Sequence, residues 1–484
     1  MLTRFSAVGF AVLLLLHQES ICFSTTQASP KLSEFRRKLH QMLTTTAPLP
    51  EAKTKGRRTR VVYPPEYGGD PTGEKESSEA FEKALEEAFA TEGGDEEEMV
   101  RGVKDLGGVV IDLEGGSYRI GKPISFPSSG GGNLVVKGGS LRASDTFPSD
   151  RHLVELSSSN SSKLDNPVEP LHTDGFFDMK AQSDVIHYED ITFRDILFDS
   201  GYRGGGILIV DSARIRINNC FFLHFTTEGI LVQRGHETFI SSCFLGQHST
   251  VGGDIGEKDY SGTAIDLASN DNAITDVAIF SAAIGIVVRG QANIITGVHC
   301  YNKATSFGGI GILVKLAGNS QTRIDNCYLD YTGIVMEDPV QVHVTNGLFL
   351  GDANIVLKSI KGQVLGLNIV NNMFSGDPNK KVPIVNLDGQ FGEIDQVVID
   401  QNNVNGMGLR STVGRLTVGG NGTKWMADFS SVLVFPNRIS HFQYSFYAQE
   451  PKFVAHCVTN VSDNVVVVET SEAVEGWVSF SVEQ

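Results

Sequence analysis

The sequence predicts an all-β chain: a right-handed parallel β-helix, with a capping helix before it and a small β region after it. A repeated phrase of short apolar strands runs from Arg214 to Lys358, and a repeat period in this range is typical of solenoids. The chain carries 52 glycines for tight corners, and nothing between the repeated strands has the apolar spacing of a helix. Coils this short cannot bury their inner face alone, so each coil must stack on the next.

Each repeat has two recognisable parts, a corner and a strand. The corners pair an aliphatic, Met or Cys residue with an aromatic one, at intervals of 21 to 36 residues: Leu197-Phe198, Cys220-Phe221, Cys243-Phe244, Ile279-Phe280, Cys300-Tyr301, Cys327-Tyr328, Leu348-Phe349 and Met373-Phe374. The strands resemble Gly-Ile-x-Val and begin at Gly229, Ala264, Gly285, Gly311, Gly333 and Asn354. A leucine-rich repeat is the alternative architecture, but the sequence lacks its LxxLxLxxN phrase.

Residues 1–28 are predicted to be a signal peptide. Arg4 precedes an apolar run from Phe5 to Leu16, and the small residues that follow offer a cleavage window. The run is too short for a comfortable membrane span, although an uncleaved anchor is the alternative. We therefore expect a secreted, extracellular glycoprotein. Three glycosylation sequons fit this expectation: Asn160, Asn421 and Asn460.

The rest of the chain is predicted to form three parts. Residues 29–59 form a basic linker, residues 60–414 the β-helix and residues 415–484 a small C-terminal β region. A helix from Glu79 to Ala90, capped by Ser77 or Ser78, begins the β-helix part. Its apolar face would cover the first coil, whose uncovered end is an unpaired sheet edge.

Charge and composition exclude several classes of partner. The formal net charge is −17, which argues against nucleic-acid binding by the molecule as a whole. An anionic ligand would need a locally basic site. No cysteine or histidine spacing resembles a zinc site. We expect a monomer that uses no cofactor and binds neither nucleic acid nor membrane.

The cysteines leave two readings open. Cys22 leaves with the signal peptide, while Cys220 with Cys243, and Cys300 with Cys327, occupy corners of neighbouring coils. Strands about 4.8 Å apart allow a disulfide, but a ladder of inward free thiols fits equally well. Cys457 has no evident partner.

The N-terminal phrases carry a family resemblance. Tyr67–Gly73, the following helix, Gly107–Leu113 and Gly116–Ile120 resemble the N-terminal cap of the pectate-lyase-like β-helix superfamily. Residues 60–410 resemble the plant Quartet-type polygalacturonases, which are relatives of the pectin-cutting glycoside hydrolases. The resemblance implies a secreted enzyme of the plant cell wall that hydrolyses α-1,4-galacturonosyl bonds in de-esterified pectin (homogalacturonan). We expect inversion, because acids on strands about 4.8 Å apart, offset along the strand, can reach the roughly 6.5–9.5 Å that it calls for.

The family's usual motifs are largely replaced in this chain. Glu228 falls on the second Asp of the Asp-Asp pair of familiar polygalacturonases. The Asn-Thr-Asp triplet would fall on Arg203-Gly204-Gly205, and the Gly-His-Gly triplet on Gly262-Thr263-Ala264. Of these motifs, only the acid at Glu228 carries over by position.

Alternation along the strands singles out a second acid. Side chains of a strand point in and out in turn, so the isoleucines form an inward column: Ile230, Ile265, Ile286, Ile312, Ile334 and Ile355. The outward column one step on is Leu231, Asp266, Val287, Leu313, Val335 and Val356, in which Asp266 is the one charge. Two residues further lies a mostly basic stripe: Gln233, Ala268, Arg289, Lys315, Glu337 and Lys358.

The loop before Asp266 is longer than in the other coils. This insertion, Gly246–Ser261, contains His248, Asp254, Asp259 and Tyr260. Long loops on a rigid scaffold often carry function, although a merely solvated excursion is the alternative. We expect Tyr260 and His248 to contact substrate.

Hydrolysis of a glycosidic bond needs two carboxyl groups, one protonated and one ionised. We expect the catalytic acids to be Glu228 and Asp266 on adjacent coils, with Asp254 or Asp259 as an alternative second acid. Substrate carboxylates would bind three cations by charge-assisted hydrogen bonds: Arg234, Arg289 and Lys315. A lyase on the same fold and a pectin-binding protein without activity are the alternative functions.

Overall fold

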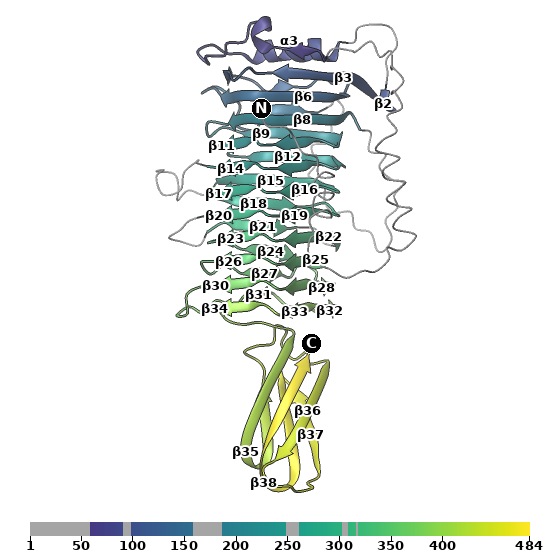
Figure 1. Cartoon of the computed structure of the whole chain (residues 1–484), viewed down its shortest axis with the longest axis vertical. Helices are drawn as coiled ribbons and strands as arrows, with labels where there is room; N and C mark the ends of the chain where they lie inside the picture. Colours follow the sequence, from purple (N-terminus) through teal and green to yellow (C-terminus); the bar gives the residue numbers. More distant parts are fainter. Residues whose placement is uncertain (1–58, 91–97, 158–185, 248–260, 303–307, 316–317) are drawn as a thin grey trace, which may run out of the picture. The chain divides into compact units, whose positions relative to one another are not determined.

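The computed structural model describes residues 59–90, 98–157, 186–247, 261–302, 308–315 and 318–484. In these ranges the strands β1 to β34 form one continuous sheet, in which consecutive coils pair in parallel (Figure 1). The predicted right-handed parallel β-helix is confirmed. Its strands fall into three stacks, here called stacks I, II and III in the order in which a coil visits them.

Stack I contains the predicted Gly-Ile-x-Val strands. It contains β5 (Ile124–Ser125), β7 (His152–Leu156), β9 (Gly205–Ala213), β12 (Glu228–His236), β15 (Ser261–Asn270), β18 (Ala282–Val288), β21 (Ile310–Val314), β24 (Ile334–Glu337), β27 (Ile355–Lys358) and β31 (Val385–Asp388). The predicted isoleucine column is confirmed, since all six side chains are fully buried in the core.

Stack II continues each coil after stack I. It contains β1 (Val61–Val62), β3 (Val103–Asp112), β6 (Gly131–Ala143), β8 (Tyr188–Asp199), β10 (Arg216–Asn218), β13 (Phe239–Ser241), β16 (Ala273–Thr275), β19 (Ile294–Thr296), β22 (Gly318–Asp325), β25 (Pro339–Thr345), β28 (Gln363–Leu365), β29 (Asn368–Val370), β32 (Glu393–Asp395) and β33 (Val398–Asp400). The short β2 (Glu98–Val100) pairs antiparallel with β3.

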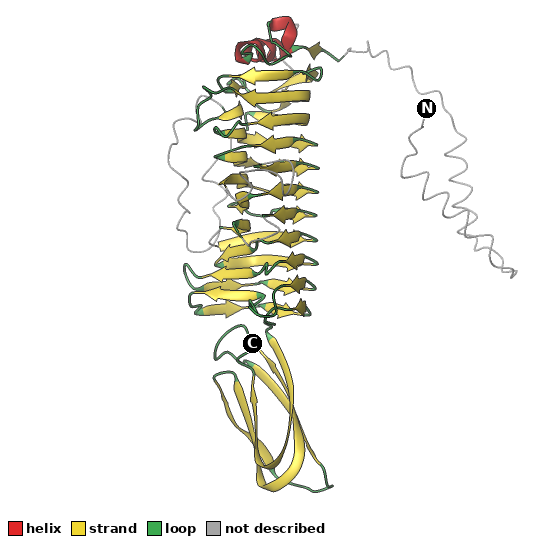
Figure 2. Cartoon of the chain, turned by 90° about the vertical axis from the view of Figure 1, so that its left-hand side faces the viewer, coloured by secondary structure: helices red, strands yellow, loops and turns green. Residues whose placement is uncertain are grey.

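Stack III closes each coil, and the second halves of β6 and β8 extend into it. It contains β4 (Ser117–Ile120), β11 (Phe221–Leu223), β14 (Phe244–Gly246), β17 (Ala278–Phe280), β20 (His299–Tyr301), β23 (Tyr328–Asp330), β26 (Leu348–Leu350), β30 (Met373–Ser375) and β34 (Asn403–Asn405). Figure 2 shows the strands of successive coils layered on one another.

The corner between stacks II and III differs from the predicted phrase. The chain bends at a residue with positive φ one position before the expected Cys, as at Asn219 and Asn326, and an asparagine tolerates this left-handed conformation. Strand register pairs Cys300 with Leu329, so Cys300 lies two positions away from the column of Cys327. The predicted alignment of Cys300 with Cys327 was wrong because aromatic rings occupy both faces of stack III, so they do not mark one face. For example, Phe222 is buried, whereas Phe221 is 45% exposed.

The five cysteines in the described part of the chain are free thiols rather than disulfides. The side chains of Cys220, Cys243, Cys300 and Cys327 are buried, and Cys457 is exposed. Each buried thiol lies within hydrogen-bonding distance of a backbone carbonyl, for example Cys243 Sγ at 3.2 Å from the oxygen of Ser241. Of the two readings, buried free thiols are the correct one, although Cys300 and Cys327 do not share a column.

The repeated glycine of stack I is required by the packing. A Cβ atom at Gly229 would lie 2.7 Å from the carbonyl oxygen of Ala264 and 3.0 Å from the buried Leu245 side chain. At Gly285 it would lie 2.4 Å from the carbonyl oxygen of Gly311. A side chain at this glycine would thus point into the core, as the side chain of the following isoleucine does. The residue before the glycine therefore faces outward.

A short helix covers the N-terminal end of the core. After the 3₁₀ turn η2 (Pro64–Tyr67), helix α3 (Ser78–Phe89) buries Phe81, Leu85 and Phe89 against the first coils. Ser77 occupies the N-cap position, one of the two predicted. The Ser77 hydroxyl makes no capping bond to the helix, and Glu76 Oε1 instead accepts a hydrogen bond from Ser78 N at 2.7 Å.

Beyond β34 the chain forms a separate four-stranded antiparallel sheet with its own core around Trp425. Its strands are β35 (Val413–Asp428), β36 (His441–Ala448), β37 (His456–Ser462) and β38 (Val465–Glu483). Among the described residues, none of the helices has the length and apolar character needed to cross a membrane.

Candidate active site

Strand register places Asp266 on the outer face of stack I, as predicted. Asp266 on β15 lies opposite Leu231 on β12 and Val287 on β18, in the outward column. Its side chain is nonetheless only 3% exposed. An outward acid that is shielded from water experiences a strong desolvation penalty.

The shield over Asp266 includes Arg289. Arg289 Nε donates to Asp266 Oδ1 at 3.0 Å, and Nη2 donates to Oδ2 at 2.6 Å, so the pair is bidentate. Burial raises the pKa of Asp266 above its ordinary value, and the charge of Glu228 adds to the rise, while Arg289 and Lys315 oppose it. The effect of desolvation on the pKa of Asp266 therefore outweighs the effect of the ion pair with Arg289.

Glu228 opens strand β12 and turns outward because Gly229 and Ile230 both face the core. Nε2 of His152 lies 3.3 Å from Glu228 Oε2. The two residues are two coils apart, because the register runs from His152 to Gly205 and then to Glu228. Gly205 makes the contact possible, since a Cβ atom there would lie 2.4 Å from the His152 ring.

The two acids are pushed in opposite directions. Burial alone would raise the pKa of Glu228, but the neighbouring His152, Thr227 and the charge of Arg289 bring it below its ordinary value. Asp266 has a raised pKa instead. A pair of carboxyl groups whose pKa values diverge in this way can divide the roles of proton acceptor and proton donor.

Sequence reasoning missed the upper part of this site. His152 is 5% exposed and Glu155 is 3% exposed, both on β7. Arg151 holds Glu155 through Nε to Oε1 at 2.8 Å and Nη2 to Oε2 at 2.5 Å. Glu155 belongs to the outward column of Asp266, through Leu208 and Leu231. An alternation count extended from β12 back to Val154 would have found it.

The other two cations predicted to bind substrate are Arg234 and Lys315. Arg234 is held by Asp211 in a bidentate pair at 2.6 and 2.8 Å, so its guanidinium is already engaged. Lys315 is exposed one coil below Arg289, and its charge reaches Asp266. At the end of the stripe, Lys358 Nζ lies 3.0 Å from Glu337 Oε1.

Part of the predicted site lies outside the described residues. These residues are His248, Asp254, Asp259, Tyr260 and the sequon residue Asn160. The sequon residues Asn421 on β35 and Asn460 on β37 are exposed. Their glycosylation stays a prediction.

Comparison with known proteins decides the family. The chain is 50% identical to polygalacturonase QRT3 of Arabidopsis thaliana over 461 residues, which cover 94% of this chain and 90% of that protein. This chain belongs to the Quartet-type polygalacturonase family. No family model matches the sequence.

Two solved structures that match this chain share little sequence identity with it. A tailspike protein of E. coli bacteriophage HK620, in complex with a pentasaccharide, has a TM-score of 0.46 and 10% identity, covering 88% of this chain and 93% of its own. The A-module of a mannuronan C-5 epimerase from Azotobacter vinelandii has a TM-score of 0.39 and 12% identity, covering 71% and 96%.

Proposed function

We propose that this chain is a secreted polygalacturonase that hydrolyses α-1,4-galacturonosyl bonds of de-esterified pectin in the plant cell wall, with inversion. The observation that carries the proposal is the position of two acids, Glu228 and Asp266, on the outer face of adjacent coils, with His152 beside the first and Arg289 beside the second. The opposite directions in which their pKa values are shifted support it. Family membership supports the reaction class, and the signal-like residues 1–28 support secretion.

The offset of the two acids favours inversion over retention. Glu228 lies opposite Thr263, three residues before Asp266 on the neighbouring strand. Strands are about 4.8 Å apart and rise about 3.3 Å per residue, so the two Cα atoms are about 11 Å apart. This separation of the Cα atoms fits the roughly 6.5–9.5 Å between the carboxyl groups of inverting enzymes better than the roughly 5 Å of retaining ones.

In the proposed reaction Glu228 is the base and Asp266 the acid. The ionised Glu228 takes a proton from the attacking water, whose oxygen bonds to the anomeric carbon. Asp266 gives its proton to the leaving glycosidic oxygen as that bond breaks. Afterwards Glu228 releases its proton and Asp266 takes one up from solvent, which returns both groups to their starting state.

Arg289 connects substrate binding with the protonation of Asp266. While Arg289 holds both oxygens of Asp266, its charge favours the ionised carboxylate and opposes the effect of burial. A galacturonate carboxylate offers the guanidinium the same bidentate partner. If Arg289 transfers to the substrate, Asp266 remains buried without its counter-charge, and burial then favours the protonated form that the reaction needs. Lys315 would hold a second substrate carboxylate.

The deciding experiment measures two products from polygalacturonate. Hydrolysis releases reducing ends with no ultraviolet-absorbing unsaturated sugar, and the E228Q and D266N variants lose that release. Unsaturated product would identify a lyase instead. Retained binding without any product would identify a pectin-binding protein, and full activity in both variants would exclude this pair of acids.

A further inference from the structure

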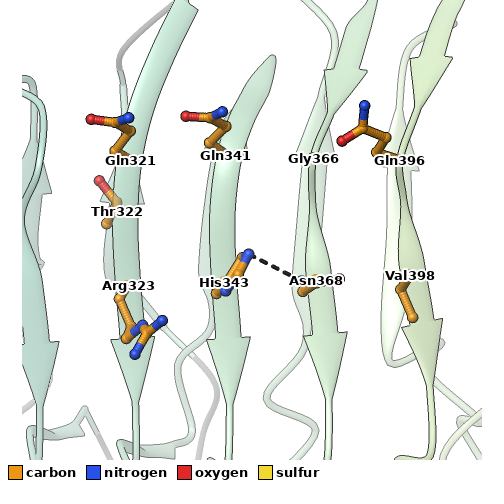
Figure 3. A pocket seen from close by; sticks show the side chains of 9 residues that line it. All are labelled: Gln321, Thr322, Arg323, Gln341, His343, Gly366, Asn368, Gln396 and Val398. Atoms are coloured by element: carbon orange, nitrogen blue, oxygen red, sulfur yellow. Dashed lines mark hydrogen bonds between the residues drawn. The ribbon is translucent and has the colours of Figure 1, made fainter.

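A polar groove lies on the outer face of stack II, on different strands from the acids. It has a volume of about 520 Å³, and Figure 3 shows its side chains on neighbouring strands of β22, β25, β29 and β33. One wall is a column of glutamines with positive φ at Gln321, Gln341 and Gln396. The other wall follows the register from Arg323 to His343, Asn368 and Val398.

A notch interrupts the glutamine column. Gly366 occupies the place of a glutamine between Gln341 and Gln396, with φ +61°. A Cβ atom there would lie 3.4 Å from Cγ of Gln341, so a longer side chain would fill the gap between the two amides. The absence of a side chain at Gly366 therefore leaves space in the groove between Gln341 and Gln396.

The lining of the groove contains the cation Arg323 in a chain of net charge −17. No carboxylate lines it, and the ionisable residues in its lining are Arg323 and His343. Two acids lie beside the lining. Asp325 accepts from Thr345 at 2.7 Å and Asn346 at 2.8 Å, and the charge of Arg323 contributes to lowering its pKa. Asp395 accepts from Nε2 of the groove residue Gln396 at 3.2 Å.

Arg323 differs from the arginines of stack I. Arg151, Arg234 and Arg289 each hold a carboxylate with two hydrogen bonds. Arg323 is exposed, and within the described ranges no hydrogen bond or ion pair joins its guanidinium to another side chain. A solvated guanidinium beside several amide groups is a ready partner for a ligand carboxylate.

We propose that this groove is a second binding site, for an oligosaccharide that carries carboxylates. Arg323 binds a carboxylate, and His343 lies one coil further along. The amides of Gln321, Gln341 and Asn368 offer both donors and acceptors, which suits a row of sugar hydroxyls. Because the groove runs across four coils, it fits an extended chain rather than a single sugar. The site holds polymer and takes no part in bond cleavage.

The test uses the full-length E228Q protein, so that cutting does not obscure binding. Isothermal titration with a homogalacturonan oligosaccharide is expected to give two sites per chain, and R323Q is expected to weaken one of them at least tenfold. G366Q fills the notch without changing charge, and it should weaken the same site. R194Q removes an equal charge from an exposed position on the same stack and should leave both sites intact.

The outcomes separate this site from the proposed activity. With the catalytic acids intact, R323Q should lower kcat/KM on long polymer and leave it unchanged on short oligosaccharides. If R323Q and R194Q weaken binding equally, the effect is general electrostatics and the proposal is wrong. If R323Q and G366Q both bind as the parent does, the proposal is also wrong. Absence of hydrolysis in the unmodified protein would contradict the proposed function but leave the groove testable by binding alone.

Discussion

Nε2 of His152 lies 3.3 Å from Oε2 of Glu228 across two coils of the β-helix. The contact passes over Gly205, where any side chain would collide with the imidazole. The histidine helps to keep the pKa of Glu228 below its ordinary value despite burial. This arrangement favours the ionised form of Glu228, which a general base requires.

Replacement of Glu228 by Gln should remove the base and leave the fold intact. We expect kcat to fall about a thousandfold, within the range of general acid–base catalysis. Release of reducing ends from polygalacturonate measures the loss. Circular dichroism and Tm should match the unmodified protein, and a large fall in Tm would mean that the change acts through folding instead.

Replacement of His152 by Ala should shift the pH profile. Because His152 lowers the pKa of Glu228, its removal raises that pKa. The base must be ionised, so activity is lost as pH falls through its pKa, and the acidic limb of kcat/KM should move to higher pH. H152A should keep more activity at neutral pH than E228Q does. An unmoved acidic limb would show that the histidine is only a packing residue.

Replacement of Arg289 by Gln should shift both limbs. Arg289 also lowers the pKa of Glu228, so the acidic limb should move to higher pH. Arg289 lowers the pKa of Asp266 against the stronger effect of burial, so its loss raises that pKa further. The acid must be protonated, and activity is lost as pH rises through its pKa. The alkaline limb should therefore move to higher pH, while KM rises because a substrate carboxylate loses its partner. R234Q is the matched control, since Arg234 is held by Asp211.

Alanine at Gly229 should destabilise the β-helix. Its Cβ would lie 2.7 Å from the carbonyl oxygen of Ala264, and overpacking of this kind costs about 1–3 kcal/mol. Gly392 offers a matched control, because a Cβ there meets nothing within 4 Å. Urea unfolding should show a lower midpoint for G229A and little change for G392A. Equal midpoints would contradict the steric explanation.

Thiol titration should separate the buried cysteines from the exposed one. Cys457 is exposed and should react rapidly with a thiol reagent in the native protein, whereas Cys220, Cys243, Cys300 and Cys327 are buried and should react only after unfolding. Reducing agent should leave Tm unchanged. A fall in Tm on reduction, or fewer reactive thiols in denaturant, would indicate disulfides.

The sequence was sufficient to predict the β-helix and the columns of stack I, because Ile230 and its equivalents must face the core together. It was insufficient for the corner before stack III, where both Phe221 and Phe222 are aromatic although they face opposite sides. In the site, Glu228 and Asp266 could be found by position and alternation. The contact of His152 with Glu228 could not, because it depends on a register carried through Gly205.

The catalytic acids and the polar groove lie on different coils of the β-helix. The two acids and the side chains within 3.3 Å of them lie between β7 and Arg289, directly after β18. The groove walls begin at β22, and each coil is held chiefly by its immediate neighbours. A duplication or loss of one whole coil below β22 would lengthen or shorten the groove without altering any contact of Glu228 or Asp266. Polymer reach and cleavage chemistry could thus evolve separately within one continuous core.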